Sequence, residues 1–305
     1  MKRFSTLLLR EWMQHRFGWI AIVAIPAALF AVVGIAGHLS MDFGEGDFIA
    51  GPGASAVTAG VTVGLAMLTL MLAWGAAVLQ SPGLARRDVQ DRSIEFWLSL
   101  PTGHVQGVGA PLLAHLVLFP LAALAAGAAA GFLISLPVVA KLYGLGAWFT
   151  QSWPALIAAA LALMLRVALG LVLATLWLSP LLLGTMAASA WLKRWGVPAV
   201  AGVLGVGGLV LDRAYGNPVV WQVLRALGDG ASRAFLVAER GVGASAAFVV
   251  RSPEEIGDTF AALPAWALAD AGHALARLAS PAFAAALLAG AAAFALLVLR
   301  RQRGA

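Results

Sequence analysis

The chain has no cysteine and little charge. Of its 305 residues, 61% are hydrophobic and 11% are charged, whereas about 25% of the residues of an ordinary soluble domain are charged. The absence of cysteine excludes disulfides, thiolate metal sites and a cysteine nucleophile. The shortage of charge excludes a soluble fold, because 20 basic and 14 acidic side chains cannot cover a domain of this size. The apolar excess therefore predicts a multi-span membrane protein.

Apolar runs that are long enough to cross about 30 Å of hydrocarbon predict six helical spans. They cover residues 17–37, 57–79, 105–136, 155–192, 197–211 and 281–299. The fourth run is long for one straight helix. We expect a single crossing that is broken near Ser179 and Pro180, because a proline inside a helix removes a hydrogen bond. An interfacial helix followed by a shorter span is the alternative for this run.

Charge placement predicts the orientation of these spans. Lys2, Arg3, Arg10 and Arg16 precede the first span, so the N-terminus is expected in the cytoplasm. With six crossings the C-terminus is cytoplasmic too, and the predicted outer loop 38–56 then contains acidic residues but no Lys or Arg. The net charge of +6 is therefore a sign of topology and of contact with anionic lipid, and not of nucleic-acid binding.

Three segments of this single domain, residues 1–305, are expected outside the bilayer core. Residues 1–16 should form an interfacial helix that lies flat before the chain turns in at Gly18, because their apolar side chains share one helical face. Residues 212–280 should form an extracytoplasmic helical insertion between spans five and six. Residues 81–103 should form a cytoplasmic segment after span two. The predicted fold is thus an all-α membrane protein with six transmembrane helices.

Ionisable groups inside the predicted spans are scarce, which disfavours an intramembrane enzyme. Every carboxylate falls in a loop or terminus, so no acidic relay for protons or sodium is expected. The five histidines are scattered along the sequence, which disfavours a metal site. His115, in span three, is expected to pack between helices or to line a pore. Arg166, the one charge inside a span, is expected to snorkel to the outer interface, with binding of an anionic group as the alternative.

Small residues and lysines give two further indications. Gly60 and Gly64, and likewise Gly127 and Gly131, have the spacing that allows close packing of membrane helices. The chain has no P-loop, because none of its lysines follows a glycine-rich turn. If ATP drives this protein, another chain has to bind the nucleotide.

The predicted cytoplasmic segment is unusual for its mixture of charge and aromatic residues. From Arg86 it reads RRDVQDRSIEFWLSLPTG, and proline and glycine on both sides bound a short helix. This helix is too polar to enter the bilayer, yet it presents Phe96 and Trp97 beside charged residues. One interpretation is a helix that rests on lipid headgroups. The other is a docking helix, since protein interfaces concentrate aromatic anchors rimmed by charge.

The stretch DRSIEFWLSLP, residues 91–101, resembles the coupling-helix region of type-2 ATP-binding cassette (ABC) exporter permeases. In that family an acidic-basic stretch, a Ser or Thr, a Glu-Phe pair and a Leu-x-Ser/Thr-Leu-Pro ending follow the second span. Residues 177–194 resemble the corresponding region in a bacterial subgroup of this family. Two features depart from the family pattern: Arg92 replaces a glycine that is frequent there, and the outer segment before the last span is longer than in many members.

The resemblance implies a transport subunit, not an enzyme, in the bacterial cytoplasmic (inner) membrane. It implies two permease chains, as a homodimer or a heterodimer, above separate ABC ATPase subunits that bind ATP and magnesium, with no cofactor in this chain. Phe96 and Trp97 would be the buried anchors of ATPase coupling, Glu95 and Arg92 their charge partners, and Asp91 a support of the helix. His115 and Arg166 are the candidate residues of a translocation path. The apolar span walls are compatible with peptides, lipids or drugs and select no substrate.

The alternative is a membrane-anchored sensory or structural protein. In that interpretation residues 212–280 bind an external ligand and the spans only hold this segment at the membrane.

Overall fold

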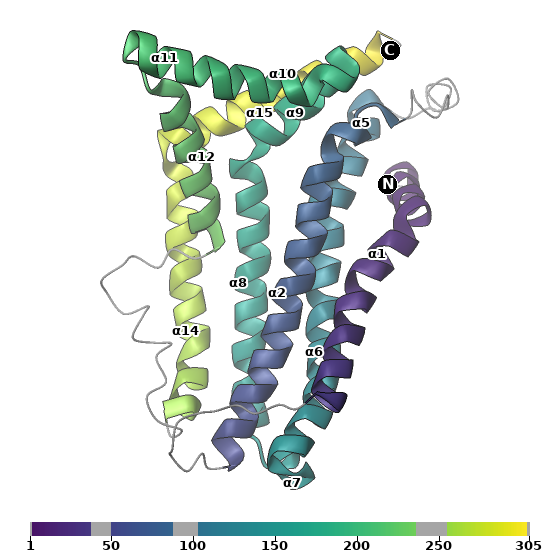
Figure 1. Ribbon diagram of the computed structural model, residues 1–305, viewed down its shortest axis with the longest axis vertical. Coiled ribbons are helices and arrows are strands. Elements are labelled where there is room, and N and C mark those ends of the chain that lie inside the picture. The colour runs from purple at the N-terminus through teal and green to yellow at the C-terminus, as the bar shows by residue number, and fades with distance from the viewer. Residues whose placement is uncertain (1, 38–49, 88–102, 236–254, 304–305) are drawn as a thin grey trace.

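A computed structural model describes residues 2–37, 50–87, 103–235 and 255–303 (Figure 1). These residues form helices and no strand, so the predicted all-α class is confirmed for this part of the chain. Six helical stretches are long and apolar enough to span a membrane. They are Phe4–Ala36, Gly53–Leu84, His104–Tyr143, Trp153–Trp177, Ser179–Tyr215 and Pro281–Gln302. The chain therefore has the character of a multi-pass membrane protein.

Most of the long helices of the bundle run along the long axis of the molecule (Figure 1). They are α1 (Lys2–Ala36), α2 (Ala50–Leu84), α6 (Phe119–Tyr143), α8 (Trp153–Trp177) and α14 (Glu255–Ala276). Helix α6 continues α5 (His104–Leu113) through η1 (Ala114–Leu118), and the short α7 (Leu145–Phe149) follows it at the opposite end.

Glycines bring α2 and α6 close together. A Cβ atom added to Gly127 would lie 2.9 Å from the Leu65 carbonyl oxygen, and one added to Gly131 would lie 2.7 Å from that of Val61. The predicted packing role of this glycine pair is confirmed, because only a residue without a side chain lets the two backbones approach so closely. A Cβ atom added to Gly60 or Gly64 would have no neighbour within 4 Å among the described residues, so the same prediction is wrong for them.

The chain breaks after Trp177, where the sequence predicted a break, but the expected single crossing over residues 155–192 is wrong: Trp153–Trp177 is one candidate span, and residues from Ser179 onward belong to the next, Ser179–Tyr215. Helix α8 ends at Trp177, and α9 (Ser179–Leu192) begins with Pro180 in its first turn. A second turn follows at Lys193, which has a φ of 56°, in η2 (Lys193–Trp195). The next helix, α10 (Gly196–Gly202), packs back against α9, because Gly196 brings its backbone directly onto that of Ser189.

Two helical stretches cross one end of the bundle and do not run along it (Figure 1). One comprises α10, η3 (Val203–Gly207) and α11 (Gly208–Tyr215), and the other is α15 (Pro281–Gln302), which packs on α9. The predicted fifth and sixth spans therefore do not follow the long axis. The turn at Lys193 and the close contact at Gly196 are the physical reason for the course of the first stretch.

Residues 212–280 differ from the predicted separate outer insertion. Helix α12 (Val219–Phe235) begins at the end that α10 and α11 cross, and both α12 and α14 pack along α8. A core of Leu173, Trp177, Leu227 and Phe283 joins this group of helices. A short turn, η4 (Arg277–Ala279), then leads to α15. The described part of this segment is thus integrated into the helical bundle because its apolar faces pack against α8.

The N-terminal helix does not bend in the predicted way. Helix α1 is continuous from Lys2 to Ala36 and passes Gly18 without a break, so the separate interfacial helix expected over residues 1–16 is not seen. The reason is that its first half already packs against the bundle: Leu7 and Glu11 are both buried.

Both termini lie at the same end of the bundle, together with the end of α2 and the start of α5 (Figure 1). The segments that the sequence analysis assigned to the cytoplasm therefore meet at one end. At the opposite end Lys141 donates hydrogen bonds to the carbonyl oxygens of Ile35 and Gly37, which satisfies the C-terminus of α1.

Candidate functional site

The residues predicted to contact an ATPase lie outside the described part of the chain. These are Asp91, Arg92, Glu95, Phe96 and Trp97. The two predicted path residues, His115 and Arg166, are described. Each is buried, and each belongs to a different ion-pair network.

The first network begins on one stripe of α1. Leu7, Glu11, His15 and Trp19 follow each other at intervals of four residues and therefore share one face of the helix. Glu11 is 0% exposed. A fully buried carboxylate is costly unless a positive charge and hydrogen bonds compensate it.

Arg87, just after α2, provides most of this compensation. Its NH2 atom donates to Oε1 of Glu11 at 2.7 Å, and its NH1 atom donates to Oε2 at 2.9 Å. This two-bond geometry is the strong form of an arginine–carboxylate pair. Arg10 adds a contact from its NH2 atom to Oε1 at 2.8 Å. Two guanidinium groups therefore hold one buried carboxylate.

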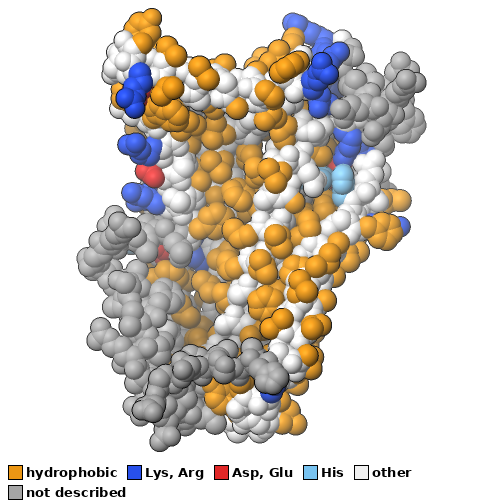
Figure 2. Space-filling model, in the orientation of Figure 1, with side chains coloured by type: hydrophobic (Ala, Val, Ile, Leu, Met, Phe, Trp, Pro, Cys, Tyr) orange, Lys and Arg blue, Asp and Glu red, His pale blue; other side chains and the backbone are white. Residues whose placement is uncertain are grey.

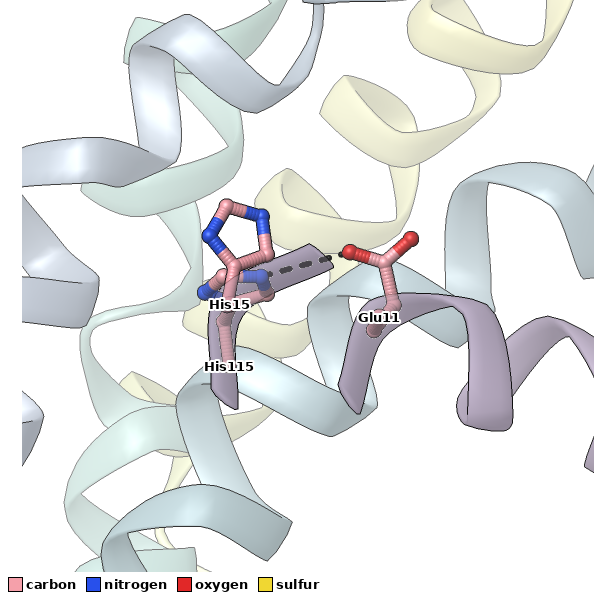
Figure 3. Close-up of side chains that lie close together, drawn as sticks. All are labelled: Glu11, His15 and His115. Atoms are coloured by element: carbon pink, nitrogen blue, oxygen red, sulfur yellow. Dashed lines mark hydrogen bonds and ion pairs between the residues drawn. The ribbon is translucent and has the colours of Figure 1, made fainter. Parts of the chain in front are cut away.

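Two histidines complete the network, which we call the Glu11 cluster: Glu11, His15, Arg87 and His115. Nε2 of His115 lies 3.3 Å from Oε2 of Glu11, and Nε2 of His15 lies 3.0 Å from NH1 of Arg87. The two imidazole rings meet edge to face at 4.7 Å (Figure 3). His115 stands in the π-helical turn η1, a local irregularity that is frequent at functional sites.

Aromatic rings enclose the Glu11 cluster on the side toward the bundle. Trp19 stacks on His15, with ring centroids 5.9 Å apart, and on Phe119, at 4.5 Å. The edge of His115 meets the Trp19 ring at 5.2 Å. This apolar wall limits access of water and strengthens the electrostatic interactions inside.

The Glu11 cluster corrects two expectations. The carboxylate of Glu11 was assigned to the terminus before the first span and the histidines were considered scattered, yet the fold brings the ligand atoms of Glu11, His15 and His115 within 4.8 Å of one another. His115 is indeed a packed polar residue, as predicted. The i, i+4 spacing of Glu11 and His15 on the apolar stripe of α1 was the signal that could have indicated the site.

The second network is centred on Arg166 in α8. Its Nε atom donates to Oδ2 of Asp270 in α14 at 2.7 Å, and its NH1 atom donates to the carbonyl oxygen of Ala234, near the end of α12, also at 2.7 Å. Arg166 is 2% exposed. The expectation that it snorkels to the interface is wrong, because a carboxylate inside the bundle compensates its charge.

An apolar pocket of about 530 Å³ lies between α9, α10, η3 and α12, and neither His115 nor Arg166 lines it. Both predicted path residues instead contact buried carboxylates inside the bundle: His115 lies beside Glu11, and Arg166 pairs with Asp270. Figure 2 shows that the described surface in view is mainly hydrophobic along the bundle, with basic side chains near the end where the termini lie.

The fold and the site define a helical, multi-pass membrane protein with two buried ion-pair networks. A comparison with known protein families, curated proteins and solved structures found no match to this chain.

Proposed function

We propose that the chain is the membrane-spanning permease subunit of an ATP-driven ABC exporter in a bacterial inner membrane. In this proposal it forms the translocation path with a second permease chain, and a separate ATPase subunit binds ATP and magnesium. The sequence of residues 91–101 motivates the proposal by its resemblance to a coupling helix.

The observation that carries the proposal is the position of Arg87. Arg87 belongs to the predicted cytoplasmic segment 81–103, and its guanidinium is bonded to both carboxylate oxygens of Glu11 in α1. His115 of η1 contacts the same carboxylate. A displacement of the rest of this segment would therefore act at once on α1 and on the α5–η1–α6 helix.

Such a link suits a coupling function. Closure of the ATPase subunits would push on the predicted coupling helix, residues 86–101, and the Glu11 cluster would pass this movement to two candidate spans. Packed elements joined by short ion pairs respond by switching between discrete arrangements, which is a population shift between transport states. Transport would thus need no ionisable relay within the membrane.

The test is to isolate the chain under mild conditions from its own cells with an affinity tag. The proposal expects co-purification of an ATPase that carries Walker motifs, identified by mass spectrometry. Replacing Phe96 and Trp97 together with Ala should remove the ATPase from the preparation while the permease stays inserted, because aromatic anchors dominate such interfaces. Lys141→Met, at the opposite end of the bundle, is the matched control and should retain it.

Glu11→Gln separates docking from coupling. It neutralises the Glu11 carboxylate but leaves the aromatic anchors Phe96 and Trp97 intact. The ATPase should therefore still co-purify, but its rate of ATP hydrolysis should no longer change when the complex is reconstituted in lipid. Isolation of the chain without any ATPase would contradict the proposal and support the membrane-anchored alternative.

A further inference from the structure

We propose that Glu11, His15 and His115 form a binding site for one divalent transition-metal ion of the zinc class, and that the guanidinium of Arg87 competes with the ion for this site. Metal binding in this sense is independent of the proposed transport function. It concerns the chemistry of the cluster alone.

The donor set fits such an ion. One carboxylate oxygen and two imidazole nitrogens lie within 4.8 Å of one another, and they come from two elements, α1 and η1. Two histidines and one carboxylate are a ligand set that zinc uses with a fourth, open position. Zinc ligands lie about 2.0–2.1 Å from the ion, so the three side chains would have to rotate toward a common point on binding.

The surroundings of the donors favour a bound cation. Glu11 is 0% exposed and His115 is 1% exposed, so a positive charge beside them is poorly screened by water. Trp19 packs against both imidazole rings and restricts their orientation. Fixed ligand orientation is what supporting residues contribute to metal affinity.

Arg87 already provides a cation at this place. Its guanidinium contacts both oxygens of Glu11 and lies 3.0 Å from Nε2 of His15, which are two of the three residues that would bind the metal. The Arg87 side chain is 16% exposed, so part of it already contacts solvent. Binding of a metal would displace the Arg87 guanidinium and break its link to Glu11 in α1.

The experiment uses the full chain in detergent without a polyhistidine tag, and Co²⁺ as the probe. Histidine and carboxylate ligands in four-coordinate geometry give Co²⁺ strong visible absorption, and Zn²⁺ should displace it. The chain with Arg87→Ala should bind one Co²⁺ about tenfold or more tightly than the wild type, because it loses the guanidinium that contacts both oxygens of Glu11 and His15, although Arg10 still contacts Oε1. Adding His115→Ala or His15→Ala to that variant should weaken binding by about 10- to 100-fold or abolish it.

His273→Ala, an exposed histidine in α14, is the matched control and should change nothing. A second readout on the wild type guards against misfolding of the Arg87 variant: Zn²⁺ should raise the midpoint of thermal unfolding of the wild type but not of His115→Ala. The proposal is overturned if Zn²⁺ leaves the wild-type midpoint unchanged, or if Co²⁺ binding does not respond to loss of His15 and His115. Both results come from the isolated chain, so they do not depend on an ATPase.

Discussion

Loss of the Arg166–Asp270 ion pair should destabilise the bundle strongly. Oδ2 of Asp270 lies 2.6 Å from NH2 and 2.7 Å from Nε of Arg166, and the two side chains are 7% and 1% exposed. Asp270→Leu leaves the guanidinium without its counter-charge in an apolar surrounding. Removing one partner of a buried pair costs about 3–5 kcal/mol. This corresponds to a factor of roughly 100 to 3,000 in the unfolding equilibrium, since about 1.4 kcal/mol is tenfold.

Arg166→Met should cost a similar amount, because it takes the guanidinium away from the buried carboxylate of Asp270. The double variant should cost much less than the sum of roughly 6–10 kcal/mol, since replacing both members of a buried pair with apolar residues is often neutral. What remains is the Ala234 carbonyl oxygen, which loses its donor NH1. An unsatisfied buried acceptor costs about 1–3 kcal/mol, and this is the loss expected of the double variant.

The assay is reversible unfolding in mixed micelles with increasing dodecyl sulfate, followed by the fluorescence of the 11 tryptophans. Arg225→Met is the control: Arg225 is exposed on α12, four residues before Asp229, and its loss should leave the unfolding free energy unchanged. Single variants within about 1 kcal/mol of the wild type, or a double variant equal to the sum of the singles, would refute the coupled buried pair.

Three other predictions test further contacts. Gly127→Ala should destabilise the folded protein by about 1–3 kcal/mol because the new methyl group meets the α2 backbone. Gly109→Ala is the control, since its added Cβ has nothing within 4 Å, and it should leave the stability unchanged. Equal thermal midpoints for both variants would contradict the close α2–α6 contact. Glu11→Ala should accelerate tryptic cleavage after Arg87, measured by mass spectrometry, because the carboxylate no longer holds that side chain; an unchanged rate would speak against the tether. Lys141→Met should cost under about 1 kcal/mol and speed hydrogen exchange only at the end of α1, since an exposed lysine contributes little to a helix C-terminus; faster exchange throughout the bundle would contradict this.

Prediction from the sequence succeeded where one local rule decides. Long apolar runs have to become helices in a membrane, because every backbone polar group needs a partner within the segment. Pro180 placed the break between α8 and α9, since a proline fits the first turn of a helix but not its interior. Gly127 and Gly131 indicated the close approach of α2 and α6.

The same reasoning failed for polar residues whose partners are distant in sequence. Arg166 was expected to snorkel to the outer interface, yet the carboxylate of Asp270, 104 positions away in the sequence, compensates its charge. Glu11 and His115 are likewise separated by 104 positions and meet only when α1 packs on η1. Periodicity shows which face of a helix a residue occupies, but it does not show which helix covers that face.

The amino-acid sequence by itself determined the membrane class, the helical structure and the crowding of basic residues near the termini, because these follow from composition and from the backbone's need for hydrogen bonds. The tertiary structure alone decided which charges are compensated inside the bundle and which helices cross its end. The turn at Lys193 sets the course of α10, and the packing of α1 against η1 assembles Glu11, His15, Arg87 and His115. Such contacts depend on the positions of whole helices relative to one another, which no local pattern specifies.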